Sequence, residues 1–159
     1  MGKFGARTNR EGTRKVTAPA AKTTSKPPAR VHVTWVGDHR FDTGRENGPI
    51  ARIDASGETG QSPVDALLSA LASCVSTDVV DILAKRRTPV ESLEIDAVGE
   101  RVDITPRRFR HITLNFQIAG SGIERAHAER AIDLAINKYC SVGDSLSRDI
   151  EVDWKLELR

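Results

Sequence analysis

Apolar residues at every second position predict short strands in the first part of the chain. In the segment RVHVTWV, Val31, Val33 and Trp35 fall on one side of an extended backbone, and polar residues fall on the other. The segments RFDT and IARID follow, each bounded by turn-forming residues. Together, the three segments predict a meander of short antiparallel strands.

A nearly all-apolar run then predicts a long helix that begins at Ser62-Pro63. Ser62 fits the N-cap, Pro63 fits the first helical position, and Asp65 complements the helix dipole. Basic residues at 85–87 and the pair Thr88-Pro89 predict its end.

The apolar residues of this helix spread around most of its circumference. They are Val64, Leu67, Leu68, Leu71, Val75, Val79, Val80, Ile82 and Leu83. Such a helix must be buried on nearly all sides, and one sheet covers only one side. The simplest cover for the other side is a second copy of the chain, so we expect a homodimer.

The second half of the chain predicts two strands, a helix and a final strand. The segments SLEIDAVGERV and RRFRHITLNFQIAG predict two strands. SGIE reads as a capping box, with Ser121 as N-cap and Glu124 three residues later, for a helix that runs to about Cys140. SVGDSLSR is expected to be irregular. The last strand has strictly alternating apolar residues, which are Ile150, Val152, Trp154, Leu156 and Leu158.

The order β-β-β-α-β-β-α-β predicts the α+β class, with helices packed on one face of a mostly antiparallel sheet. At 159 residues the chain is long enough for one domain with a substantial core. We place this domain at residues 31–159 and a disordered tail at residues 1–30.

Charge is distributed unevenly between these two parts. Residues 1–30 hold eight Lys and Arg against Glu11 alone, which leaves 16 basic and 21 acidic residues in 31–159. The tail has too few large apolar residues to order itself and no apolar core of a secretory signal, so we expect a cytoplasmic protein. We expect no specific nucleic-acid partner. No membrane partner is expected either, because the uncharged run at 66–77 is too short to span a bilayer.

Two cysteines are the candidate chemical groups. Cys74 lies inside the first helix and Cys140 at the end of the second, 66 positions later. Buried cysteines are common and unreactive, so both are compatible with a purely structural role. Alternatively, Cys74 attacks an O–O bond and Cys140 resolves the resulting sulfenic acid, if the two thiols meet across the helices. Because Asp78 follows Cys74 by one turn, a reactive Cys74 needs a cation from elsewhere in the fold. The four histidines show no metal-ligand spacing, and no metal or cofactor is expected.

The motifs SPVDALLSALASC, DVVDIL and KYCSV, the last followed by SL, resemble the OsmC/Ohr family of thiol-dependent peroxidases. The resemblance spans roughly residues 31–159. It implies an intertwined homodimer with two long central helices and a cysteine pair near the subunit interface. It also implies that organic hydroperoxides, fatty-acid hydroperoxides included, are reduced to alcohols. Cys74 would be the peroxidatic cysteine and Cys140 the resolving one, and an external dithiol or a lipoylated protein would supply the electrons.

The resemblance also implies an activating arginine in the early hairpin. TGRENG makes Arg45 the best match, with Arg40 and Arg52 as lesser candidates. Ohr-type members carry a glutamate ten residues before the first cysteine, where this chain has Val64. Asp65 resembles the carboxylate of another branch of the family, or is simply a first-turn acid; Glu58 is a further candidate to orient the arginine.

Two other functions are compatible with the sequence. A non-enzymatic dimer of this family would bind a small apolar ligand, and a thiol stress protein would act on disulfides instead of peroxides.

Overall fold

The computed structural model describes residues 27–159 and confirms the α+β class. The predicted tail lies outside the described residues, apart from 27–30. The elements are β1 (His32–Trp35), β2 (Arg40–Gly44), β3 (Ile50–Asp54), α1 (Pro63–Lys85), β4 (Ser92–Arg101), β5 (Phe109–Ala119), α2 (Arg125–Leu134), η1 (Ala135–Tyr139), α3 (Ser141–Asp144) and β6 (Glu151–Leu158).

The predicted meander is present as an antiparallel sheet in the order β1-β2-β3. The register sets Val33 opposite Thr43 and Trp35 opposite Phe41, so alternate residues of β1 share one face. On that face Val33 is 58% exposed and Trp35 is 65% exposed. The apolar side predicted from the sequence is therefore not covered by the described part of this chain.

A buried carboxylate organises the loop from β3 to α1. Asp54 is 2% exposed, and its two oxygens accept hydrogen bonds from the backbone N–H and the hydroxyl of both Ser56 and Thr59. The hydrogen bonds from Thr59 and then from Ser56 hold the pKa of Asp54 well below its usual range. This loop connects the end of β3 to the start of α1.

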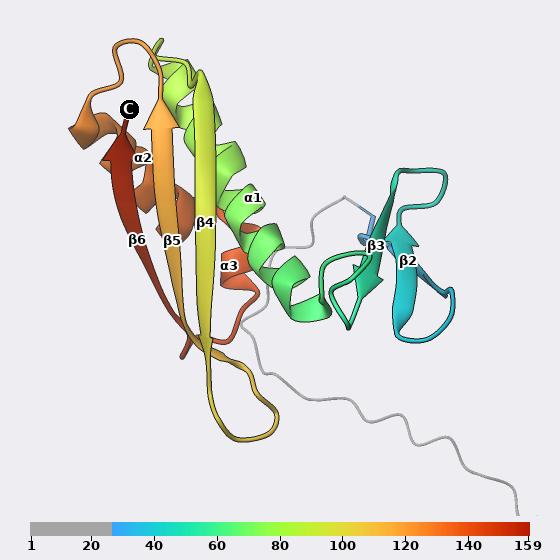
Figure 1. Cartoon of the computed structure of the whole chain (residues 1–159). Helices are drawn as coiled ribbons and strands as arrows, with labels where there is room; N and C mark the ends of the chain where they lie inside the picture. Colours follow the sequence, from blue (N-terminus) through green and yellow to red (C-terminus); the bar gives the residue numbers. More distant parts are fainter. Residues whose placement is uncertain (1–26) are drawn as a thin grey trace, which may run out of the picture. The chain divides into compact units, whose positions relative to one another are not determined.

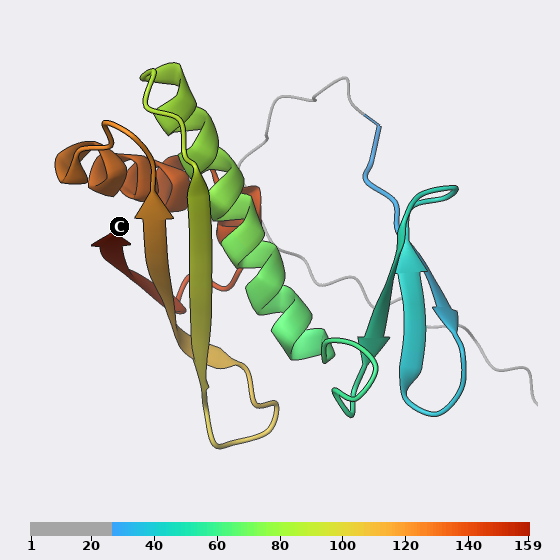
Figure 2. The ribbon, with the colours of Figure 1, turned by 45° about the horizontal axis from the view of Figure 1, so that its top comes forward.

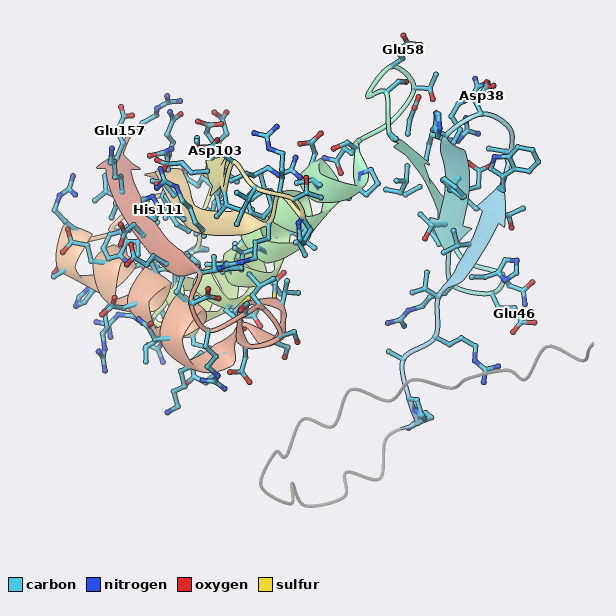
Figure 3. All side chains as sticks on the ribbon, turned by 90° about the horizontal axis from the view of Figure 1, so that it is seen from below. Asp38, Glu46, Glu58, Asp103, His111 and Glu157 are labelled. Carbon is cyan, nitrogen blue, oxygen red and sulfur yellow. The ribbon has the colours of Figure 1, made fainter. Side chains whose placement is uncertain are left out.

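The second sheet has the order β4-β5-β6 and carries the core. β4 and β5 are antiparallel, whereas β6 runs parallel to β5 because α2, η1 and α3 carry the chain back between them. α1 and α2 lie on one face of this sheet (Figures 1 and 2). β5 turns its buried side chains to the helices, and these are Ile112, Leu114, Phe116 and Ile118. His111 and Glu157 project from the opposite face (Figure 3).

The start of α1 is as predicted. The Ser62 hydroxyl accepts from the Asp65 N–H at 3.2 Å, and the Asp65 carboxylate accepts from the Ser62 N–H at 3.3 Å, which completes a capping box. Pro63 occupies the first turn, and the helix ends at Lys85.

α1 is buried along one side only. Its buried stripe, packed in the core with β5, is Leu71, Val75, Val79 and Leu83. On the other side Leu67 is 39% exposed and Val80 is 38% exposed. By length and composition α1 is also apolar enough to cross a membrane, a test that core helices of soluble proteins pass as well.

The predicted start of the second helix is wrong. α2 begins at Arg125, and its N-cap is Glu124, whose side chain makes no capping hydrogen bond. Gly122 adopts a left-handed φ of +74°, so the chain turns there instead of entering a helix. The Ser121 N–H donates to the Glu91 carboxylate at 3.1 Å. The capping box read from SGIE is therefore not formed.

Candidate functional site

Cys74 lies on the flank of the buried stripe of α1. It comes three residues after Leu71 and directly before Val75, and it is partly buried against the core. This position follows from the 3.6-residue period, which turns position 74 away from the centre of the stripe. The elements that pack beside α1 include η1 and α3, and the side of α1 that carries Cys74 faces them.

Cys140 is positioned by a break in helical geometry. After Leu134 the helix widens into the single π turn of η1, and the Cys140 N–H donates to the Ala135 carbonyl, five residues back, at 2.9 Å. Cys140 itself is extended and forms the N-cap of α3, where its Sγ accepts from the Gly143 N–H at 3.2 Å. The sequence predicted the end of the helix near Cys140 but missed the π turn. It also described 141–148 as irregular, whereas residues 141–144 form α3.

The structure brings the two predicted cysteines together. Both are free thiols, and the side chain of Cys74 lies next to that of Cys140. Burial raises the pKa of the Cys140 thiol to about 11, outweighing the Gly143 N–H, which favours the thiolate; the neighbouring Cys74 acts in the same direction as burial. Cys140 is only 3% exposed, whereas Cys74 is partly exposed. The two sulfurs therefore lie in different surroundings although they are in contact.

A cavity of about 510 Å³ lies beside Cys140. Apolar side chains such as Leu71 and Val152 form part of its lining, and Cys140 lines it whereas Cys74 does not. Lys138 and Arg148 also line it.

Within residues 27–159, none of the three predicted arginines makes a hydrogen bond or an ion pair with Cys74 or Cys140. Arg40 pairs with Asp38, and Arg52 pairs with Asp42. Between residues 27 and 159, no hydrogen bond or ion pair joins the side chain of Arg45 to another residue, and Arg45 lies in the turn between β2 and β3. Of the three, Arg45 is the one whose guanidinium is not held by a carboxylate within this part of the chain.

Of the two carboxylates considered for this site, Asp65 has a local role and Glu58 is exposed. Asp65 belongs to the capping box, as its first-turn position suggested. It also lines a second cavity, of about 370 Å³, together with Val64 and Arg101, a cation that the sequence did not single out. Glu58 is exposed on the loop before α1 (Figure 3).

Comparison with known proteins gives consistent similarities. Residues 55–155 match the family model described as OsmC-like protein. Protein YhfA of Escherichia coli K12 is 34% identical over 130 residues, which is 81% of this chain and 97% of that protein. The crystal structure of a hypothetical protein from Aquifex aeolicus VF5 has a TM-score of 0.70 at 26% identity, over 82% of this chain and 96% of that one. The organic hydroperoxide resistance protein OhrB of Bacillus subtilis has the same fold, with a TM-score of 0.56 at 16% identity over 80% of this chain and 98% of that one.

The raised pKa of Cys140 gives a direct test of this geometry. In Cys74→Ser protein we expect the thiolate absorbance of Cys140 to develop only well above the pH at which an ordinary thiol ionises, because burial, the largest cause of its raised pKa, remains. Ultraviolet titration against the Cys74→Ser, Cys140→Ser double variant isolates this signal from tyrosine ionisation. A midpoint near the ordinary thiol value of about 8.5 would contradict the burial of Cys140.

Proposed function

The chain belongs to the family of OsmC-like proteins, and from this premise we propose that it is a thiol-dependent peroxidase that reduces organic hydroperoxides to alcohols. The observation that carries the proposal is the contact between the Cys74 and Cys140 thiols across α1 and the end of η1. A structural neighbour named as an organic hydroperoxide resistance protein supports the same reaction class.

The two thiols suit two successive steps. The Cys74 thiolate attacks the terminal oxygen of R–O–OH, the O–O bond breaks, and the alkoxide takes a proton to leave as an alcohol. Cys74 is then a sulfenic acid. The Cys140 sulfur attacks the Cys74 sulfur, the hydroxyl leaves with the thiol proton as water, and a disulfide forms. An external dithiol, free or carried on a lipoylated protein, restores both thiols, and no metal or cofactor takes part.

The surroundings of each thiol support this division of roles. Cys140 is buried, and its pKa is raised to about 11, so at neutral pH it remains a thiol and is a weak nucleophile toward peroxide. Cys74 is the more exposed of the two sulfurs. A peroxide therefore meets Cys74 first, and Cys140 reacts once its neighbour has become an electrophile.

The two cysteine variants separate these steps. We expect Cys74→Ser to abolish hydroperoxide consumption in the presence of dithiol, because no attacking sulfur remains. Cys140→Ser should consume about one equivalent of hydroperoxide and then stall as a sulfenic acid that over-oxidises. Peroxide consumption together with mass spectrometry of Cys74 measures both. Near-normal turnover in either variant would exclude this mechanism. A binding protein would be indifferent to Cys74→Ser, and a disulfide reductase would be inactivated by it without ever consuming peroxide.

A homodimer is the second part of the proposal. Two apolar surfaces are open in the single chain: the side of α1 that contains Leu67 and Val80, and the face of β1 that contains Val33 and Trp35. Exposed apolar surface of this extent is typical of an interface. A second copy covers both surfaces with one symmetric contact, since each copy offers the same pair.

Val80→Asp tests the dimer without disturbing the core. Because Val80 is 38% exposed in the single chain, a monomer would tolerate the charge, whereas an interface would bury it unpaired. We expect light scattering of the wild type to give a dimer at micromolar concentration, and Val80→Asp to shift it toward monomer or to unfold it. Ala126→Asp, at an exposed position of α2, is the control that should leave the mass unchanged. A well-folded wild-type monomer would contradict the proposal.

Arg45 is the cation that we assign to Cys74. A thiolate one turn from Asp78 requires a positive neighbour, and arginine stays charged when it is desolvated and forms two parallel hydrogen bonds. Arg40 and Arg52 are already paired with carboxylates, whereas Arg45 has no such pair among residues 27–159. We therefore propose that Arg45 acts on the cysteine pair of the other copy in the dimer, since no hydrogen bond or ion pair joins its side chain to a residue of its own chain among residues 27–159.

Arg45→Ala should slow the oxidation of Cys74 by hydroperoxide roughly tenfold to a hundredfold while the fold is retained, because charge stabilisation at the reacting sulfur is lost. Arg45→Lys should recover part of the rate, since it restores the charge without the planar fork. Stopped-flow oxidation of stoichiometric protein measures the rate. Arg40→Ala is the matched control and should change it little. If Arg45→Ala matches the wild type, the activating cation is another residue.

A further inference from the structure

We propose that the dithiol that regenerates the protein attacks the Sγ atom of Cys140, and not that of Cys74, through the cavity beside Cys140. This inference rests on the proposed function for the origin of the disulfide. To the dithiol of the proposed function it adds the sulfur that is attacked and the route by which the dithiol arrives.

The geometry around Cys140 sets the direction of attack. Its sulfur has Cys74 on one side, and it lines the cavity of about 510 Å³, which Cys74 does not line. Thiol–disulfide exchange needs the incoming sulfur to approach along the S–S axis, opposite the sulfur that leaves, and its rate depends on which sulfur is accessible. A thiolate in this cavity therefore meets Cys140 and displaces Cys74.

The leaving groups favour the same direction. The sulfur with the lower thiol pKa leaves faster, and burial raises the pKa of Cys140 to about 11. Attack at Cys74 would require Cys140 to leave as an anion from an apolar pocket in the first, intermolecular step, whereas attack at Cys140 defers that departure to the intramolecular step that closes the cyclic disulfide. Attack at Cys140 instead releases Cys74, the more exposed sulfur.

The steps balance as a two-electron exchange. The first reductant thiolate bonds to Cys140 Sγ, the Cys74–Cys140 bond breaks, and its electron pair goes to Cys74. The second reductant thiolate then attacks the reductant sulfur of the mixed disulfide. The bond to Cys140 breaks, and Cys140 takes the electron pair and then a proton. The Gly143 N–H, 3.2 Å from this sulfur, is placed to stabilise the charge during that step. The dithiol is thereby oxidised to a cyclic disulfide, and both cysteines are reduced.

The lining of the cavity indicates the class of reductant. Ile150 and Val152 form an apolar part of the cavity wall. Lys138 and Arg148 are basic, and Asp144, the one acidic residue in the lining, is paired with Arg148 at 3.2 Å. A net positive cavity attracts a thiolate, and the apolar wall accepts the hydrocarbon chain that carries it.

The decisive experiment identifies the sulfur that bonds to the reductant. Diamide, which oxidises thiols without peroxide chemistry, converts the wild type to the disulfide. Sub-stoichiometric 6-mercaptohexanoate is added, the reaction is stopped with acid within milliseconds, and peptides are mapped by mass spectrometry. We expect the mixed disulfide on Cys140 and a free thiol at Cys74. A mixed disulfide found mainly on Cys74, or failure of the two cysteines to form a disulfide, overturns the inference.

Two serines supply a matched pair of cavity variants. Ser147 lines the cavity and Ser145 does not, although both are exposed and each donates one local hydrogen bond. Ser147→Trp should slow reduction of the disulfide by dihydrolipoamide about tenfold, whereas Ser145→Trp should not. Circular dichroism checks that both fold. Equal reduction rates in two folded variants would overturn the proposed route.

The outcomes separate this inference from the proposed function. If hydroperoxide does not oxidise Cys74 but the diamide disulfide opens at Cys140, the peroxidase is excluded and the reductant route is retained. If hydroperoxide is consumed but the mixed disulfide forms on Cys74, the peroxidase is retained and the route is wrong.

Discussion

The packing of α1 on the β4-β5-β6 sheet determines where the two cysteines can lie. The buried stripe from Leu71 to Leu83 faces the inner side chains of β5, and burial of each large aliphatic side chain contributes about 1.5–3 kcal/mol. This contact fixes the rotation of α1 about its own axis. Cys74 is then held at the flank of the stripe, where only the elements beside α1 are within reach. The end of η1 is one of these elements, and it carries Cys140.

Local rules predicted α1 well because its start depends on neighbours in sequence. The capping box of Ser62 and Asp65 and the alternation along β5 and β6 are all readable from short windows. The same rules predicted Ser121 as the N-cap of the second helix. Ser121 makes no cap, because the turn at Gly122 competes with the helix. The proximity of the two thiols could not be predicted from residues alone. The cysteines are 66 positions apart in sequence, and their distance in space depends on how the two helical segments that carry them pack together. The family resemblance named the two cysteines, and the structure supplies their contact.

One chain holds both sulfurs but does not bring a predicted cation to them. In the proposed mechanism, resolution needs the proximity of the two thiols, whereas the oxidation of Cys74 needs a positive charge that Arg45 does not deliver within the described residues. With the cation supplied by a second copy, the reactivity of Cys74 becomes linked to association, and the fraction of activated protein follows the dimer concentration by mass action. The exposed apolar side of α1 and Arg45, which has no carboxylate partner among residues 27–159, would then belong to one interface that the second copy completes.

The π turn of η1 makes the thiol contact depend on backbone geometry as well as on side chains. A π turn is an α turn that contains one additional residue, and each residue of an α-helix advances the helix by about 100°. If residues 135–139 closed into a regular α turn without losing a residue, Cys140 would rotate by about that angle away from α1. Deletion of one residue together with closure of the turn would instead leave the cysteine close to its present direction, because the π turn accommodates the additional residue locally. A relative with the same residues but a regular turn here would thus keep the core and separate the two cysteines.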